Sequence, residues 1–160
     1  MNRQPLQGYR VLTFENFGAG PFGSLYLANL GAEVIKIESR DAGGDATRSM
    51  GPYFLGLSDS HFFQTFNMNK KSVVLNLKTP EGQAAFHKLA ATAHVVLNNL
   101  RGDLPTKLGL DYSALGKVNP AIADQITRTR DAASAFELYA QAERQASLAN
   151  RTLMDNTAFG

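Results

Sequence analysis

The fold is decided by residues 10–38, RVLTFENFGAGPFGSLYLANLGAEVIKIE. Both ends of this stretch, residues 10–14 and 33–37, are short runs rich in apolar and β-branched side chains, a pattern typical of buried strands. Between them, residues 21–30 predict a helix that begins at Pro21, because a missing N–H costs nothing in the first helical turn. A strand, a helix and a second strand in this order form a β-α-β unit, whose two strands are parallel.

Strands and helices continue to alternate along the chain. Gly31 predicts the left-handed end of the first helix. Residues 72–77 predict a third strand, residues 94–97 a fourth, and residues 112–118 a short helix. Thr79 predicts the N-terminal cap of a helix between the third and fourth strands. We expect that helix to face the core with Ala84, Ala85, Leu89 and Ala90. The sequence therefore predicts an α/β fold, in which helices flank a Rossmann-like parallel sheet.

Length and composition favour a globular domain with a sizeable core. The chain has 160 residues, of which 44% are hydrophobic and 19% are charged. Near the C-terminal end, residues 131–150 predict one long amphipathic helix.

Charge and residue usage exclude several classes of function. The 16 basic and 14 acidic side chains leave a net charge of +2 and are scattered, so we expect no nucleic-acid partner. The lack of cysteine excludes disulfides, iron–sulfur clusters and cysteine nucleophiles, and three histidines leave little for a metal site. No apolar run reaches the ~18 residues that a membrane span needs, and the first residues lack the apolar core of a secretion signal. We therefore expect a cytoplasmic protein with no membrane partner.

A glycine motif lies between the first strand and the first helix. Residues 18–23, GAGPFG, match the G-x-G-x-x-G pattern of dinucleotide-binding folds, and Glu38 follows where such folds place the acid that binds ribose. Pro21, however, removes one of the N–H donors that a phosphate would need. An NAD(P) site and a purely structural tight turn both stay open at this point.

Basic residues lie near the ends of the predicted strands, with two arginines after the second strand, two lysines before the third and one lysine after it. They are Arg40, Arg48, Lys70, Lys71 and Lys78. Both arginines lie in residues 39–60, a long Gly-rich stretch that predicts a loop, and loops of this length are usually functional. The arginines could bind a phosphate through two hydrogen bonds each, or pair with Asp41 or Asp45. The lysines could attract a polyanion, or simply face solvent at a strand end.

Seven blocks of sequence carry a family resemblance. They are PLQGYRVL (5–12), AGP (19–21), LGAEVIKIE (30–38), GDATR (44–48), NKKSV (69–73), LKTPEG (77–82) and LGLDY (108–112). In kind and order they resemble family III CoA-transferases, the CaiB/BaiF group, which includes formyl-CoA transferase, carnitine CoA-transferase and α-methylacyl-CoA racemase. The resemblance covers residues 5–120. It implies a CoA-binding Rossmann-like domain over residues 1–120, followed by a divergent helical tail over residues 121–160.

This resemblance implies an acyl-CoA transferase, which moves CoA between an acyl-CoA and a carboxylic acid through an aspartyl intermediate. It implies coenzyme A as the ligand, no metal, and a loop at residues 15–20 that borders the thioester. By position, the implied CoA-binding residues are Phe17, Gly18, Ala19, Ser39, Arg40, Leu75, Lys78, Asn99, Leu100 and Lys107.

Two of these positions depart from the family pattern, and a third differs from one member of the family. Leu100 stands where the family has an aromatic side chain, so a stacking face is lost. Lys107 stands for an arginine and offers a point charge instead of a two-pronged donor. Gly18 stands where formyl-CoA transferase has a glutamine that touches the acyl group, so formyl-CoA is not supported as the substrate.

The match weakens after Pro120. Residues 153–160, LMDNTAFG, are similar to the segment around the family's catalytic aspartate, which implies Asp155 as the nucleophile; the alternative is an exposed terminal aspartate. Family members are longer and form interlocked dimers, which implies a shortened or truncated large domain that works as a homodimer or with a companion chain. Three hypotheses stay open: a transferase or racemase domain, a CoA-binding or subunit fragment without catalysis, and an NAD(P)-binding domain.

Overall fold

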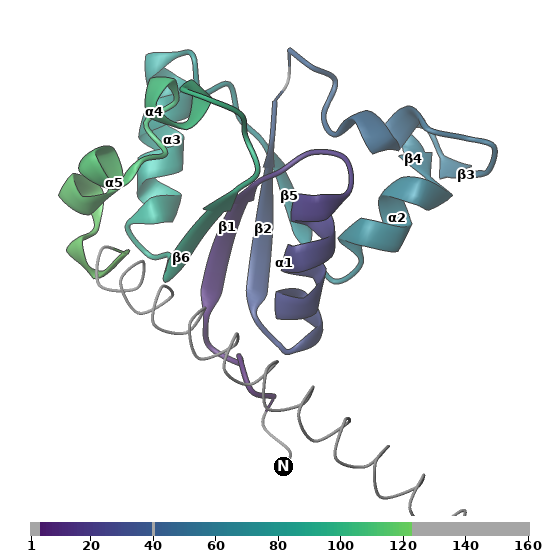
Figure 1. Ribbon diagram of the computed structural model, residues 1–160, viewed down its shortest axis with the longest axis horizontal. Coiled ribbons are helices and arrows are strands. Elements are labelled where there is room, and N and C mark those ends of the chain that lie inside the picture. The colour runs from purple at the N-terminus through teal and green to yellow at the C-terminus, as the bar shows by residue number, and fades with distance from the viewer. Residues whose placement is uncertain (1–3, 40, 123–160) are drawn as a thin grey trace, which may run out of the picture. The chain divides into compact units, whose positions relative to one another are not determined.

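The computed structural model describes residues 4–39 and 41–122 (Figure 1). Arg40, the helix expected over residues 131–150 and Asp155 lie outside the described residues. In chain order the elements are β1 (Arg10–Phe14), α1 (Ala19–Asn29), β2 (Glu33–Glu38), the short 3₁₀ helix η1 (Ala46–Ser49), β3 (Phe54–Gly56), β4 (Asp59–Ser60), α2 (His61–Asn67), β5 (Lys71–Val74), α3 (Pro80–Ala90), β6 (Val95–Asn98), α4 (Leu104–Lys107) and α5 (Tyr112–Val118).

A parallel sheet with the strand order β5-β2-β1-β6 forms the centre of the domain. Strand β1 pairs in parallel with β2, with Leu12 beside Ile35, and with β6, with Leu12 beside Val96. Strand β2 pairs in parallel with β5, with Ile37 beside Val73. The α/β prediction, a parallel sheet flanked by helices, is confirmed. Because the chain runs from β1 to β2 and β5 on one side and then to β6 on the other, its winding reverses between β1 and β6, where ligands of such sheets bind.

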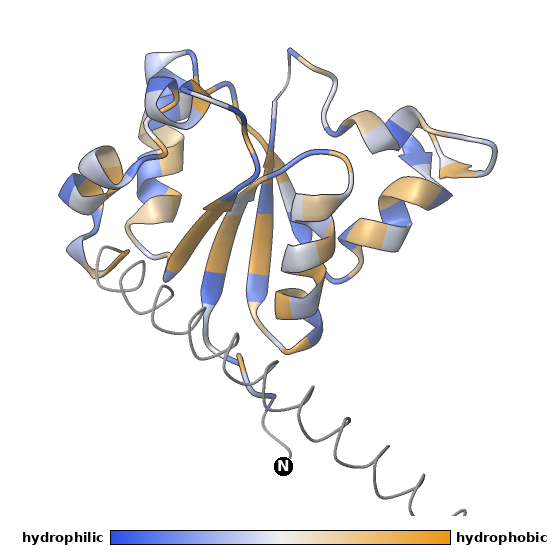
Figure 2. Cartoon of the chain, in the orientation of Figure 1, coloured by the Kyte–Doolittle hydropathy of each residue, from blue (hydrophilic) through white to orange (hydrophobic). Residues whose placement is uncertain are grey.

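Helices cover both faces of the sheet, with α1 and α3 on opposite sides in Figure 1. On one face, Val11 and Val34 form a core cluster with Ala28 of α1. On the other face, the ring of Phe14 meets the ring of Phe86 of α3 edge to face, with centroids 5.0 Å apart. Figure 2 shows hydrophobic residues along most of the length of the strands, as burial on both faces requires.

Helix α1 begins earlier than the sequence predicts. Its N-cap is Gly18 and its first residue is Ala19, so Pro21 is the third helical residue and not the first. The N–H groups of the whole first turn lack acceptors within the helix, so a proline fits at its third position as well. Gly31 has a φ of +97°, which confirms the left-handed end of the helix.

Helix α3 confirms its predicted cap and part of its predicted inner face, since Ala90 is buried and Ala85 and Leu89 are half-buried. The hydroxyl of Thr79 accepts a hydrogen bond from the N–H of Gly82 at 3.2 Å. The buried residues of the helix are Gly82, Phe86 and Ala90, whereas Ala84 is exposed. Residues four apart lie on the same side of a helix, so the core-facing stripe begins at the glycine and runs through the phenylalanine.

Two stretches differ from the prediction in secondary structure. One predicted strand is shorter, and one predicted loop contains regular elements. The third strand, β5, ends at Val74, because a turn begins at Asn76, whose carbonyl accepts the N–H of Thr79 at 3.1 Å. The loop expected over residues 39–60 is irregular only in part, since it contains η1 and the antiparallel pair of β3 and β4.

Candidate functional site

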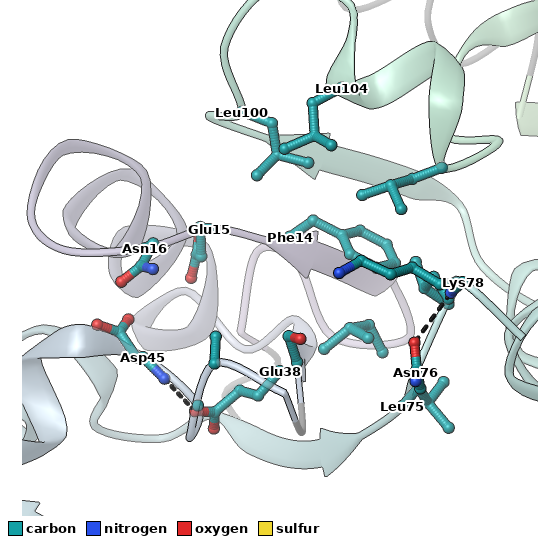
Figure 3. A pocket seen from close by; sticks show the side chains of 16 residues that line it. Phe14, Glu15, Asn16, Glu38, Asp45, Leu75, Asn76, Lys78, Leu100 and Leu104 are labelled. Atoms are coloured by element: carbon teal, nitrogen blue, oxygen red, sulfur yellow. Dashed lines mark hydrogen bonds between the residues drawn. The ribbon is translucent and has the colours of Figure 1, made fainter.

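A pocket opens at the carboxyl ends of the sheet strands (Figure 3). Its volume is about 300 Å³, at the lower end of the range for small-molecule sites. The lining residues come from the end of β1, the end of β2 and its following loop, the turn after β5, and the segment around α4. They are Phe14, Glu15, Asn16, Ile37, Glu38, Ser39, Ala42, Gly44, Asp45, Leu75, Asn76, Leu77, Lys78, Leu100, Leu104 and Leu108.

Part of the pocket wall is aliphatic. In Figure 3, Leu100 and Leu104 lie on one side of the pocket and Leu75 on the other, with the ring of Phe14 between them. These side chains offer apolar surface to a ligand from two directions. A flat, weakly polar group such as a nucleobase fits such a wall through its faces.

One lysine brings positive charge to the pocket. The side chain of Lys78 is 71% exposed, and its Nζ lies 3.8 Å from Oδ2 of Asp41, which is too long for a hydrogen bond. A loosely held ammonium group at the rim can turn toward a ligand phosphate at little cost. The pocket therefore combines apolar walls with a cation suited to an anionic ligand.

The carboxylate of Glu38 is fully engaged within the protein. Nε of Arg48 donates to its Oε2 at 2.8 Å and Nη2 donates to its Oε1 at 2.6 Å, while the N–H of Asp45 and the hydroxyl of Ser72 donate as well. Burial opposes ionisation, but these hydrogen bonds outweigh it and lower the pKa of Glu38 to about 2. A carboxylate with its acceptor sites filled in this way cannot also receive the hydroxyls of a ribose, which argues against the NAD(P) hypothesis.

A second set of charges is buried between the sheet and α1. Nζ of Lys36 lies 2.7 Å from Oδ2 of Asp45 and donates to the carbonyl of Glu15 at 3.0 Å. Oε1 of Glu15 receives hydrogen bonds from Nζ of Lys70 at 2.8 Å and from the hydroxyl of Ser24 at 2.6 Å. We call Glu15, Lys36, Asp45 and Lys70 the buried charge cluster; their side chains are at most 1% exposed.

Burial and ion pairing act on the pKa values of this cluster in opposite directions. Burial raises the pKa of Asp45, but the hydrogen bonds from Lys36 and Thr47 outweigh it, so the pKa lies below its ordinary value. Burial also lowers the pKa of Lys70, and its hydrogen bond to Glu15 does not fully offset this. The cluster holds two bases and two acids, so its charges balance.

Hydrogen bonds of Asn16 hold the turn after β1 to two other segments of the chain. The N–H of Asn16 donates to Oδ1 of Asn99 at 3.0 Å, and Nδ2 of Asn99 donates back to its carbonyl at 3.1 Å. Oδ1 of Asn16 accepts the N–H of Ala46 at 3.0 Å. Gly20 leaves room for this arrangement, because a Cβ there would lie 2.8 Å from Cγ of Asn99.

The structure brings part of the predicted CoA-binding set together. Ser39, Leu75, Lys78 and Leu100 all line the pocket, although they come from three separate segments of the chain. Asn99 does not line it but holds Asn16, which does.

The remaining predicted positions lie beside the pocket or outside the described part of the chain. Phe17, Gly18 and Ala19 follow Asn16 directly and lead into α1. The side chain of Lys107 is 68% exposed and pairs with Asp103 at 2.7 Å. It does not line the pocket, but it shares α4 with Leu104, which does. Arg40 and Asp155 are outside the described residues.

Sequence reasoning missed the buried charge cluster and the part that Glu38 plays. The one available signal was Lys36 itself, a lysine in the middle of the apolar run EVIKI. A charge at an inward strand position needs a buried partner. Its partner Asp45 lies in a Gly-rich loop, where spacing alone does not reveal the pairing.

Three further observations concern metal binding, membrane spanning and one histidine. In the described ranges 4–39 and 41–122, no three His, Cys, Asp or Glu side chains gather in a way that could hold a metal ion. Within the same ranges, no helix has both the length and the apolar character to cross a bilayer. Nδ1 of His94 accepts the N–H of Arg10 at 3.0 Å, so this histidine has a structural partner.

The fold is an α/β domain with a pocket at the carboxyl ends of the strands of its parallel sheet. Residues 6–123 match the sequence pattern of CoA-transferase family III. The chain belongs to this family.

Known relatives agree with this assignment. The chain is 41% identical over 125 residues to succinate–glutarate CoA-transferase of Agrobacterium fabrum, a match that covers 75% of this chain and 31% of the relative. It is 41% identical over 119 residues to mouse succinyl-CoA:glutarate CoA-transferase, covering 74% of this chain and 27% of the relative. The crystal structure of a CaiB/BaiF family protein from Brucella suis superposes with a TM-score of 0.67 at 36% identity, covering 74% of this chain and 32% of that one. The chain thus spans about a third of the length of these relatives.

Proposed function

We propose that the pocket at the carboxyl ends of the strands binds coenzyme A, and that the chain is the CoA-binding part of an enzyme that transfers CoA between an acyl-CoA and a carboxylic acid. The observation that carries this proposal is the convergence of Ser39, Leu75, Lys78 and Leu100 on one pocket. These residues were assigned to CoA from the family resemblance, and the fold places them around one cavity. In this proposal, residues 1–120 form the CoA-binding domain.

The chemistry of the pocket suits the adenosine end of CoA. The adenine ring packs between Leu75 and Leu100, whose aliphatic side chains replace a stacking contact by apolar burial. Ser39 and Lys78 lie where they can donate to the phosphate groups, and Lys107 adds a second positive charge from α4. Because Glu38 is engaged by Arg48, no free carboxylate on β2 repels the phosphates.

The acyl end of the ligand then lies toward the turn at residues 16–19. In the family mechanism, an aspartate carboxylate attacks the thioester carbonyl and the CoA thiolate leaves, forming an aspartyl anhydride. The thiolate attacks the aspartyl carbonyl of the anhydride, which releases the first acid and leaves an aspartyl-CoA thioester. The second acid repeats these steps in reverse and leaves as the new acyl-CoA. We propose Asp155 as this aspartate, on the basis of the local sequence LMDNTAFG.

A partner chain forms part of the proposal. Several large apolar side chains of residues 53–57 are open to solvent: Tyr53 at 72%, Phe54 at 51%, Leu55 at 77% and Leu57 at 101%. Contiguous exposed apolar side chains mark association surfaces. We propose that this surface meets a second copy or a companion chain. Sedimentation equilibrium tests this, and a mass of 17.4 kDa at all concentrations would exclude the second copy.

Calorimetry with CoA and with NAD tests the ligand assignment. We expect CoA to bind and NAD to bind more weakly or not at all. Lys78→Ala should weaken CoA binding about fivefold, since an exposed charge pair contributes up to ~1 kcal/mol. Lys88→Ala is the matched control, because Lys88 is an exposed lysine of α3 that does not line the pocket. Tighter binding of NAD than of CoA would overturn the assignment.

The second candidate function is CoA binding without catalysis. The pocket is lined by described residues that can hold a ligand without Asp155. Exchange of a labelled acid into an acyl-CoA, measured for the natural chain and for Asp155→Asn, separates the two. Exchange that disappears in Asp155→Asn supports the transferase, whereas no exchange in either chain, with CoA binding intact, supports the binding function.

A further inference from the structure

The turn between β1 and α1 has an unusual backbone conformation at Phe17. Its φ is +71°, a left-handed value that a side chain with a Cβ rarely adopts. Phe17 is 51% exposed and the centroid of its ring lies 6.0 Å from that of Phe62, so packing of the side chain does not account for the conformation. Strained residues of this kind persist where surrounding contacts hold them, and they cluster at ligand sites.

The contact that holds this conformation comes from a distant carboxylate. The N–H of Phe17 donates to Oδ1 of Asp45 at 3.3 Å. The same oxygen accepts the N–H of Thr47 at 2.9 Å and its hydroxyl at 2.8 Å, so its position is fixed within its own loop. Asp45 therefore joins the loop after β2 to the turn after β1.

Lys36 in turn holds Asp45. Its Nζ lies 2.7 Å from the other carboxylate oxygen, Oδ2, and donates to the carbonyl of Glu15, two residues before Phe17. Lys36 is thus bound both to the start of the turn and to the carboxylate that the turn contacts. Its ammonium and the Asp45 carboxylate are fully buried, so neither can be lost alone without leaving an uncompensated charge.

A buried ion pair is a poor way to stabilise a fold, because desolvation costs about as much as the attraction returns. The pair does, however, fix directions, since Oδ1 of Asp45 accepts from Phe17 and Thr47 while Lys36 contacts both Oδ2 of Asp45 and the carbonyl of Glu15. The pair fixes the turn at residues 16–19. Asn16 of this turn lines the pocket, and the residues after it lead into α1.

We infer that Asp45, held by Lys36, is a positioning residue that keeps the turn at residues 16–19 in the conformation that meets the acyl end of the ligand. This inference rests on the proposed CoA site. The ion pair biases the backbone of Phe17 toward its left-handed state, and the ligand then binds a turn that is already in place. Without the pair, the turn occupies the competent state only part of the time, and apparent affinity falls by that fraction.

The effect should be confined to one end of the ligand. Adenosine 3′,5′-bisphosphate carries only the nucleotide end of CoA, which the proposed site places against Leu75, Leu100 and Lys78. Acetyl-CoA reaches the turn as well. Loss of the pair should therefore weaken acetyl-CoA and leave the bisphosphate nearly unchanged.

The test uses the full-length chain with Lys36→Met and Asp45→Leu combined, which removes the pair without leaving an unpaired charge. We expect acetyl-CoA affinity to fall about tenfold, as for a turn competent one-tenth of the time, and bisphosphate affinity to change less than about twofold. Thermal unfolding and circular dichroism report whether the variant is folded. If it is not, Lys36→Gln combined with Asp45→Asn serves, since it removes both charges and keeps both side chains polar and similar in size.

A third substitution separates positioning from direct contact. Phe17→Gly, added to the double variant, should restore part of the acetyl-CoA affinity, because glycine adopts a φ of +71° without strain. If Asp45 acts by touching the ligand, glycine at position 17 restores nothing and the inference fails. It also fails if the double variant binds both ligands like the natural chain. If the natural chain binds neither ligand, the proposed CoA site itself is wrong.

Discussion

The guanidinium of Arg48 grips the carboxylate of Glu38 with two hydrogen bonds, Nε to Oε2 at 2.8 Å and Nη2 to Oε1 at 2.6 Å. The same guanidinium lies over the ring of Phe63, 3.8 Å from its centroid. The pair of Arg48 and Glu38, which we call the clamp, joins the end of β2 to η1. It closes the loop that forms one wall of the pocket. Both halves of the clamp lie in segments that the sequence marked as ligand-binding, yet here they bind each other.

Arg48→Met should destabilise the fold. It leaves the buried Glu38 carboxylate without its cation, and we expect the free energy of unfolding to fall by about 2 kcal/mol, below the 3–5 kcal/mol typical of fully buried pairs because Arg48 is partly exposed. Lys71→Met is the control, since it removes an ion pair to Glu33 from a lysine side chain that is 68% exposed and should cost under ~1 kcal/mol. Urea denaturation measures the free energy of unfolding of both variants. Equal losses would show that the pair of Arg48 and Glu38 contributes no more than an exposed ion pair.

Stability should fall in acid because of the same clamp. The pKa of Glu38 is lowered to about 2 in the folded chain, below its ordinary value of 4.5, so the folded state binds this proton more weakly than the unfolded state. The stabilisation is therefore complete above about pH 5 and is lost as the pH falls toward 2. Asp45, whose pKa is also lowered, contributes in the same direction. Urea denaturation at several pH values should show this slope, and Arg48→Met should flatten it; an unchanged slope in the variant would assign it to other carboxylates.

Two glycines of α1 should respond to alanine in opposite ways. A Cβ at Gly20 would lie 2.8 Å from Cγ of Asn99 and 2.9 Å from Cβ of Glu15, so Gly20→Ala should push Asn99 away from Asn16 and weaken both folding and CoA binding. A Cβ at Gly23 would meet nothing within 4 Å, so Gly23→Ala should raise stability by about 0.5–1 kcal/mol through helix propensity. Thermal unfolding and CoA calorimetry of both variants check this. A Gly20→Ala chain that binds and unfolds like the natural one would contradict the role given to Asn99.

An aromatic side chain at position 100 should strengthen CoA binding. Leu100 lines the pocket where the family resemblance expects an aromatic ring, and stacking on adenine adds about 0.5–1.5 kcal/mol to simple burial. We therefore expect Leu100→Phe to raise CoA affinity about threefold by calorimetry. Leu108→Phe adds the same volume at another lining position and should give no gain. A gain from Leu108→Phe alone would place the base elsewhere in the pocket.

Much of the fold could be predicted from local sequence. The limits of α5, residues 112–118, match the prediction, because Asp111 caps the helix by accepting the N–H of Ala114 at 3.0 Å. Gly31 likewise marks the end of α1 through its own backbone preference. Such features depend on a few neighbouring residues. The predicted start of α1 at Pro21 was wrong, because a proline is compatible with several positions in the first turn of a helix.

The candidate site could be predicted only in part. Leu75, Lys78 and Leu100 were found through the family resemblance, and their convergence required the parallel sheet. The pairing of Lys36 with Asp45 joins two residues from different structural elements, and no local pattern encodes it. The left-handed backbone of Phe17 could not be predicted either, because the carboxylate that its N–H contacts lies in another loop.

The central claim is that CoA binds at the carboxyl ends of the strands, and the location of binding tests it most directly. NMR spectra of the ¹⁵N-labelled chain, titrated with CoA, report each backbone amide separately. We predict that the largest shifts occur at Ser39, Leu75, Lys78 and Leu100, and that NAD at the same concentration does not reproduce them. Saturable shifts confined to residues away from this pocket, or no shifts with CoA at millimolar concentration, would contradict the account.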